Sequence, residues 1–138
     1  MEACSFPLPY DYSKYLFYSS FFIGASSLVC LYFKDYYSFL VMFVLFLSSI
    51  HYWSNTIDGI GRYLDLYMCR VFGFYFYINS LLYKDEFSQQ IYTYGMYNVI
   101  FLFLIENIFY YYNNPKWIIL HMGVHFYSVF TPFVLYIL

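Results

Sequence analysis

The chain has 138 residues, of which 63% are hydrophobic, 30% aromatic and only 10% charged. Soluble domains carry about 25% charged residues and disordered chains are poor in apolar ones, so this composition excludes both classes. Six basic and eight acidic residues give a net charge of −2 with no basic run, which predicts no nucleic-acid partner. An integral membrane protein remains, with membrane lipids and other membrane proteins as the expected partners.

The sparse charges divide the sequence into five apolar stretches, most of them close to the roughly 20 residues that cross a bilayer as a helix. In chain order, we predict helices over residues 15–33, 38–53, 63–83, 91–112 and 117–138. The stretches are continuously apolar and do not alternate, which argues against membrane β-strands. The sequence therefore predicts an all-α, polytopic membrane helix bundle of about five transmembrane helices, forming one transmembrane domain over residues 1–138.

Five crossings put the N-terminus, the second loop and the fourth loop on one side of the membrane, which we call the near face. The basic residues divide unequally between the two faces, with Lys14, Arg62, Arg70 and Lys116 near and Lys34 and Lys84 far. Because basic residues are enriched on the cytosolic side of membrane proteins, we expect the near face, with the N-terminus, to be cytosolic.

Charged and imidazole side chains inside the apolar stretches gather toward the near face. A charge at the centre of a spanning helix costs about 2.5–3.5 kcal/mol, so such residues usually have a role. Once helix direction is taken into account, all of them lie toward this face: His51, Asp65, Arg70, Glu106, His121 and His125. Their shared depth indicates a common site more strongly than any one of them does.

The histidines predict a metal site. His121 and His125 form an H-x-x-x-H pair, which puts both imidazoles on one face of a helix, one turn apart. His51, at the near-face end of the second predicted helix, can supply a third nitrogen. Three protein ligands with one open position are typical of catalytic zinc, whose bound water attacks an acyl carbon. Asp65 can orient a ligand or accept the proton of that water, and Ser48 can hydrogen-bond in the same shell.

Each of these residues also has a structural interpretation. Beside two aromatic residues, His51 fits an interfacial belt. Asp65 can form an ion pair with Arg70 near a helix end, and Glu106 can be a helix-end carboxylate, at the end that the helix dipole disfavours. Haem is a weaker alternative to zinc, because the two histidines of the H-x-x-x-H pair share one helix face and suit a single small ion better.

The order of these motifs resembles the CREST superfamily of membrane hydrolases, which includes the alkaline ceramidases and the adiponectin receptors. The resemblance covers the second, third and fifth predicted helices. It implies zinc bound by His51, His121 and His125, with Asp65 of the R-Y-L-D segment as the family's acid and Ser48 as its serine. It also implies cleavage of an amide bond in a lipid such as ceramide by zinc-activated water.

The sequence departs from the superfamily pattern in two respects, and its acid has an alternative. The superfamily has seven helices, whereas five are predicted here, although losing two helices still returns the H-x-x-x-H pair to the near face. The family's serine precedes its histidine by four residues, whereas Ser48 precedes His51 by three. Asp58, in the polar loop after the second predicted helix, is an alternative to Asp65.

Two hypotheses of function follow. The first is a compact zinc-dependent integral-membrane hydrolase that acts on a lipid amide or ester. The second is a non-catalytic small subunit of a large membrane complex, encoded by an AT-rich organellar or viral genome, since A/T-rich codons specify Phe, Tyr, Ile and Asn. Convergence of the three histidines around one point favours the hydrolase, and their separation favours the subunit.

Overall fold

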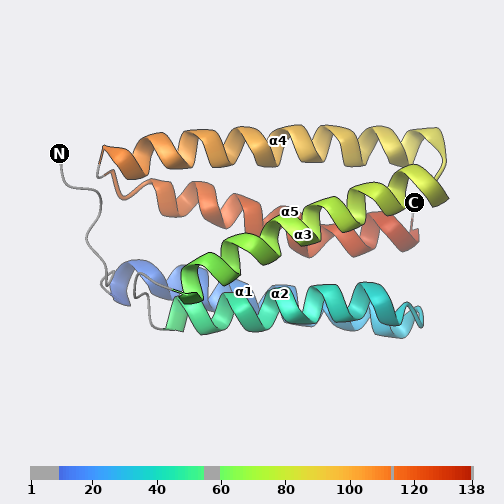
Figure 1. Cartoon of the computed structure of the whole chain (residues 1–138), viewed down its shortest axis with the longest axis horizontal. Helices are drawn as coiled ribbons and strands as arrows, with labels where there is room; N and C mark the ends of the chain where they lie inside the picture. The colour runs from blue at the N-terminus through green and yellow to red at the C-terminus, as the bar shows by residue number, and fades with distance from the viewer. Residues whose placement is uncertain (1–9, 55–59, 113, 138) are drawn as a thin grey trace.

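The structure, a computed structural model, describes residues 10–54, 60–112 and 114–137, and these form helices joined by short turns. The helices are α1 (Tyr10–Tyr32), α2 (Tyr36–Ser54), α3 (Ile60–Tyr83), α4 (Glu86–Tyr111) and α5 (Trp117–Ile137). They run up and down along the long axis of the bundle (Figure 1). The near end is therefore the end where α1, α3 and α5 begin and where α2 and α4 finish. The predicted all-α helix bundle is confirmed.

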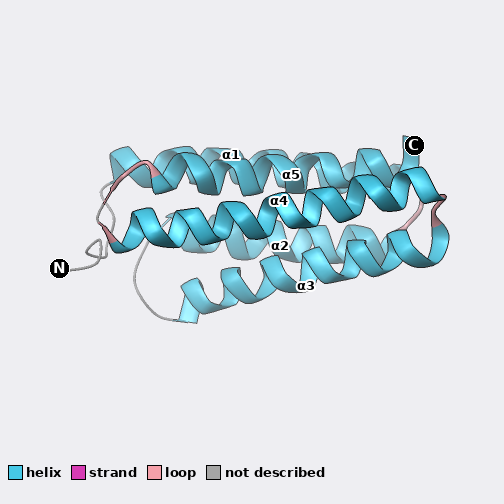
Figure 2. Cartoon of the chain, turned by 90° about the horizontal axis from the view of Figure 1, so that it is seen from above, coloured by secondary structure: helices cyan, strands magenta, loops and turns pink. Residues whose placement is uncertain are grey.

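The five helices form a ring. Each helix packs against the next one in the sequence, α5 also packs against α1, and α3 and α4 make the loosest contact. Seen from above, α1 and α5 lie on one side of the bundle and α3 on the other (Figure 2). The ring brings residues from the second, third, fourth and fifth helices around a shared interior.

Four of the helices are long and apolar enough to cross a membrane, namely α1 from Ser13 onward, α2, α4 and α5. These four helices, together with the low content of charge, indicate a membrane protein. Helix α3 has sufficient length, 24 residues, but it is less apolar and includes Arg62, Asp65 and Arg70. It is inclined to the other helices, running from beside α2 at the near end toward α4 at the far end (Figure 1).

The start of α4 differs from the prediction. The helix begins at Glu86, whereas the apolar stretch predicted a start at residue 91. Asp85 caps the helix, since its side chain accepts a hydrogen bond from the backbone N–H of Ser88 at 3.1 Å. Because the first turn is polar, hydropathy gave no signal for it. Helix α1 likewise begins before the predicted residue 15, at Tyr10.

Small residues let α1 pack closely against α2, as they do in many membrane helix pairs. Ser20 is fully buried, and its hydroxyl donates to the Leu16 carbonyl at 2.7 Å and to the Ser49 hydroxyl of α2 at 3.1 Å. A Cβ on Gly24 would lie only 3.0 Å from the Phe46 ring of α2. This contact fixes how α2 is rotated relative to α1, and therefore which residues of α2 face the interior.

A polar network at the far end was not predicted from the sequence. Asp35, in the turn between α1 and α2, accepts hydrogen bonds from the backbone and the hydroxyl of Ser38, at 3.1 and 2.7 Å. It also accepts one from the Tyr136 hydroxyl of α5 at 2.7 Å. The Ser38 hydroxyl lies 3.1 Å from that of Tyr75 on α3. Asp35 therefore links the α1–α2 turn to α5 and, through Ser38, to α3.

The Asp35 network predicts a dependence of stability on pH. Burial opposes ionisation of Asp35, but the hydrogen bonds from Ser38 and Tyr136 outweigh it and lower the pKa of this carboxyl. The stabilisation is then complete above the ordinary carboxyl pKa of about 3.9 and is lost as pH falls through the lower value of the folded state. We expect Asp35→Asn to lower the free energy of unfolding by about 1 kcal/mol at neutral pH and to make this difference shrink below about pH 4.

Thermal unfolding of both proteins in detergent across a pH series measures this effect. Asp85 also has a lowered pKa, because its carboxylate accepts hydrogen bonds from Ser88. Since Asp85 is present in both proteins, the difference between them reports Asp35 alone. A difference that stays constant down to the lowest pH would contradict the assignment.

Candidate functional site

The structure brings four of the five predicted site residues together at the near end. Asp65 on α3 is 1% exposed, and His121 and His125 on α5 are 2% and 3% exposed. Ser48 on α2 is also buried, and its hydroxyl faces the Asp65 carboxyl. His51 is different, because its side chain is exposed and its ring lies beside Gly61 of α3.

The two histidines of the H-x-x-x-H pair are held by different neighbouring helices. Their rings meet edge to face with centroids 5.1 Å apart. Nδ1 of His121 lies 2.8 Å from Oε1 of Glu106 on α4, and Nδ1 of His125 lies 2.7 Å from the Ser19 hydroxyl of α1. Ser19 was not predicted as a site residue. Glu106 pairs with His121 in the interior of the bundle. The interpretation of Glu106 as no more than a helix-end carboxylate is therefore wrong.

The Asp65 carboxyl lies inside this cluster. Its electrostatic neighbours are His121, Glu106 and the hydroxyls of Ser48 and Ser49. The alternative ion pair with Arg70 does not form, since Arg70 is exposed and makes no salt bridge with Asp65. The cluster therefore combines two carboxyl groups and an imidazole, contributed by three different helices.

Four buried polar atoms in this region have no hydrogen-bond partner among the described residues. They are Nε1 of Trp53, Oδ1 of Asp65, Oε2 of Glu106 and Nε2 of His121. Leaving one such group unpaired costs about 1–3 kcal/mol, so native structures rarely contain several together. All four residues line one cavity of about 380 Å³, which we call the polar cavity. Its walls come from α2, α3, α4 and α5.

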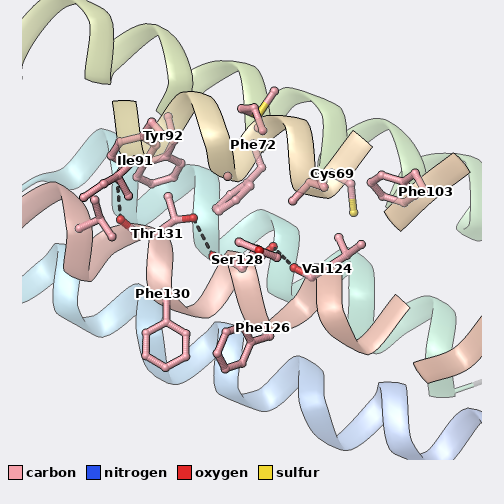
Figure 3. Close-up of a pocket in the computed structure, with 17 residues that line it drawn as sticks. Cys69, Phe72, Ile91, Tyr92, Phe103, Val124, Phe126, Ser128, Phe130 and Thr131 are labelled. Atoms are coloured by element: carbon pink, nitrogen blue, oxygen red, sulfur yellow. Dashed lines mark hydrogen bonds between the residues drawn. The ribbon is translucent and has the colours of Figure 1, made fainter. Parts of the chain in front are cut away.

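A second cavity of about 210 Å³, the apolar cavity, adjoins the first between α3, α4 and α5. Figure 3 shows its lining, with Cys69, Phe103 and Val124 at one end and Ile91, Tyr92 and Thr131 at the other. The two cavities share the wall residues Cys69, Gly73, Met96, Val99 and Phe103. A cavity with polar groups at the near end is thus adjacent to an apolar one toward the middle of the bundle.

The residues implied for zinc do not form one ligand set. His121 and His125 are buried with their rings in contact, whereas His51 is exposed and its ring lies beside Gly61. Within residues 10–54, 60–112 and 114–137, no group of three or more His, Cys, Asp or Glu side chains is arranged to hold a metal ion. The described residues do not fit a three-histidine zinc centre, and zinc binding stays a prediction. The alternative acid, Asp58, lies outside the described residues.

Comparison with known proteins gives no match to a protein-family model, to a curated protein or to a solved structure. The resemblance to the CREST superfamily thus rests on the sequence motifs alone. Of those motifs, Ser48, Asp65 and the H-x-x-x-H pair lie together, and His51 lies apart.

Proposed function

We propose that this chain is an integral membrane protein that binds a lipid with an amide or ester head group in the polar cavity. The observation that carries the proposal is that the four residues with buried, unpartnered polar atoms all line that one cavity. The carboxylate oxygens of Asp65 and Glu106 can accept from hydroxyl or amide N–H groups, and Nε1 of Trp53 can donate to a carbonyl. A head group with a carbonyl and a hydroxyl or amide N–H satisfies both kinds of atom.

The adjoining apolar cavity supports a lipid rather than a soluble polar molecule. Small-molecule sites are mostly apolar with a few placed polar groups, and here the two parts are separated along one axis. Arg62 and Arg70 also line the polar cavity and belong to the basic excess of the near end. This excess keeps the cytosolic side as the expected location of the site.

Hydrolysis of the bound lipid by zinc-activated water stays a prediction of the family resemblance. The second hypothesis, a non-catalytic subunit of a membrane complex, gains support from the separation of His51 from the other two histidines. Lipid binding is compatible with either, because it depends on Asp65, Glu106 and Trp53 and not on a third histidine.

Asp65→Asn tests the proposed function. A long-chain fatty acid ethanolamide is a suitable probe, since its head group has a carbonyl acceptor and both amide and hydroxyl donors. Replacing an acceptor oxygen of Asp65 by an amide N–H removes a hydrogen bond to a charged group, worth about 1.5–3 kcal/mol. We expect the affinity of the detergent-solubilised protein for the probe to fall at least about tenfold in equilibrium binding measurements.

Glu86→Gln is the matched control. Glu86 is exposed in the first turn of α4, at the far end of the bundle and outside both cavities, so its neutralisation should leave the affinity unchanged. Thermal unfolding checks that both variants are folded. Equal affinity of wild type and Asp65→Asn, or an equal loss in both variants, would contradict the proposal.

A further inference from the structure

We infer that the apolar cavity holds the hydrocarbon chain of the bound lipid and that Gly95 determines how long a chain it accepts. This inference rests on the proposed function, because a chain can enter the apolar cavity in this direction only when its head group occupies the polar cavity. The occupant follows from the adjacency of the two cavities, which lie on either side of five shared wall residues.

Helix α3 gives the direction and the length of this path. Asp65, Cys69, Gly73 and Phe76 follow one another at intervals of three or four residues, so they lie along one face of the helix. The 11 residues from Asp65 to Phe76 (76 − 65) correspond to about 16 Å of helix. Asp65 lines the polar cavity and Phe76 the apolar one, so the path runs from the near end toward the middle of the bundle.

Tyr92 stands at the far end of the path. It is 8% exposed, and its hydroxyl donates to the Thr131 carbonyl at 2.6 Å, which links α4 to α5. Figure 3 shows Tyr92 and Thr131 at the end of the cavity opposite Cys69, while Phe126 and Phe130 point to the outer side of α5. A chain that enters from the polar cavity therefore ends against Tyr92.

Gly95 differs from the glycines that serve helix packing. Membrane helices commonly use glycine where two helices approach closely. A Cβ on Gly24 would lie 3.0 Å from Phe46, and one on Gly123 would lie 3.1 Å from Leu102. A Cβ on Gly95 would meet no atom within 4 Å, although Gly95 lines the apolar cavity. No neighbouring helix fills the space beside Gly95, so we assign this space to the lipid chain.

Fatty acid ethanolamides of increasing chain length test the inference. For the wild type, affinity should rise by roughly fourfold for each methylene buried and should stop rising once the chain reaches Tyr92. In Gly95→Phe the ring occupies part of the cavity. We expect the longest chains to lose at least about tenfold in affinity and the shortest chains to bind as they do to the wild type.

Two variants control for the added bulk. Gly95→Ala adds only one methyl group to the cavity, so the chain length at which affinity stops rising should change little. Ile119→Phe adds a ring to an exposed position of α5 that lines neither cavity, and it should leave the whole series unchanged. Should Gly95→Phe fail to fold, Ile91→Phe narrows the apolar cavity from the same helix at a position that does not line the polar cavity.

The possible results separate this inference from the proposed function. A loss confined to long chains supports the inference. If Gly95→Phe loses affinity equally at every chain length, or loses none, the role assigned to Gly95 is overturned. In either case, binding of the ethanolamides by the wild type still supports the proposed function. If the wild type binds no member of the series more tightly than Asp65→Asn does, the proposed function fails, and this inference fails with it.

Discussion

Replacement of His121 by alanine is expected to lower the free energy of unfolding by about 3–5 kcal/mol, because it leaves Glu106 inside the bundle without its partner. The two side chains are 2% and 14% exposed and lie 2.8 Å apart, so the imidazole is the close partner of this carboxyl. Chemical unfolding of the solubilised protein, followed by loss of helical signal, measures the effect.

A double-mutant cycle separates the lost pair from the lost volume of the imidazole. Replacing both residues by apolar ones, as His121→Phe with Glu106→Leu, removes the need for a partner, and such double replacements are often close to neutral. We therefore expect the double variant to be more stable than either single variant of the cycle. A double variant destabilised by the full sum of the two single effects would show that the pair contributes nothing.

His51→Ala is the control for loss of an imidazole as such. His51 is exposed, and surface substitutions usually change stability by less than about 0.5 kcal/mol. A destabilisation by His51→Ala as large as that by His121→Ala would mean that His51 has a buried partner. The structure shows no such partner among the residues that it describes.

The approximate positions of the helices in the chain could be predicted because the requirement for membrane crossing is a simple one. A run of apolar residues without charge must form a helix of bilayer length, since hydrocarbon offers no partner to the backbone. The beginning of α4 could not be located in this way, because the cap formed by Asp85 and Ser88 is polar and hydropathy does not register it. The Asp35 network escaped prediction for a related reason, because the partner Tyr136 lies 101 residues away in the sequence.

The sequence predicted how deep the residues of the candidate site lie, but not the direction in which their side chains point. Position within a helix says how deep a residue lies, and this was sufficient to bring Asp65, His121 and Ser48 together. The direction in which a side chain points depends on helix rotation, which packing determines. Ser49 faces the interior, where it accepts from Ser20, and a residue two positions later is rotated by about 200°. His51 is that residue, and it consequently faces outward.

The partners of the two inner histidines depend on which helices are neighbours. Ser19 on α1 reaches His125 because α5 closes the ring against α1, and Glu106 reaches His121 because α4 flanks α5 on its other side. Short loops predict contacts between successive helices, but they do not predict closure between the first helix and the last. The depth of Glu106 along its helix could be predicted from the sequence, whereas its partner follows from the way the helices close into a ring.

The second large effect is expected at Gly24, which lines neither cavity. Gly24→Leu forces bulk against Phe46, whose ring would lie 3.0 Å from a Cβ and has little room to move because it packs against Phe21 and Phe43. Overpacking of this kind costs about 1–3 kcal/mol. Gly95→Leu is the matched control, since no atom lies within 4 Å of a Cβ there and helix propensity favours leucine by up to about 1 kcal/mol.

The two glycine variants also separate packing from binding. In Gly24→Leu, α1 and α2 must move apart or rotate, which disturbs the contact between Ser20 and Ser49 and hence the hydroxyls that face Asp65. We expect this variant to lose stability and to bind ethanolamides of every chain length more weakly. Gly95→Leu should keep its stability and lose affinity for long chains only. Unfolding and binding measured on the same preparations give both results, and equal behaviour of the two variants would refute the distinction between the two glycines.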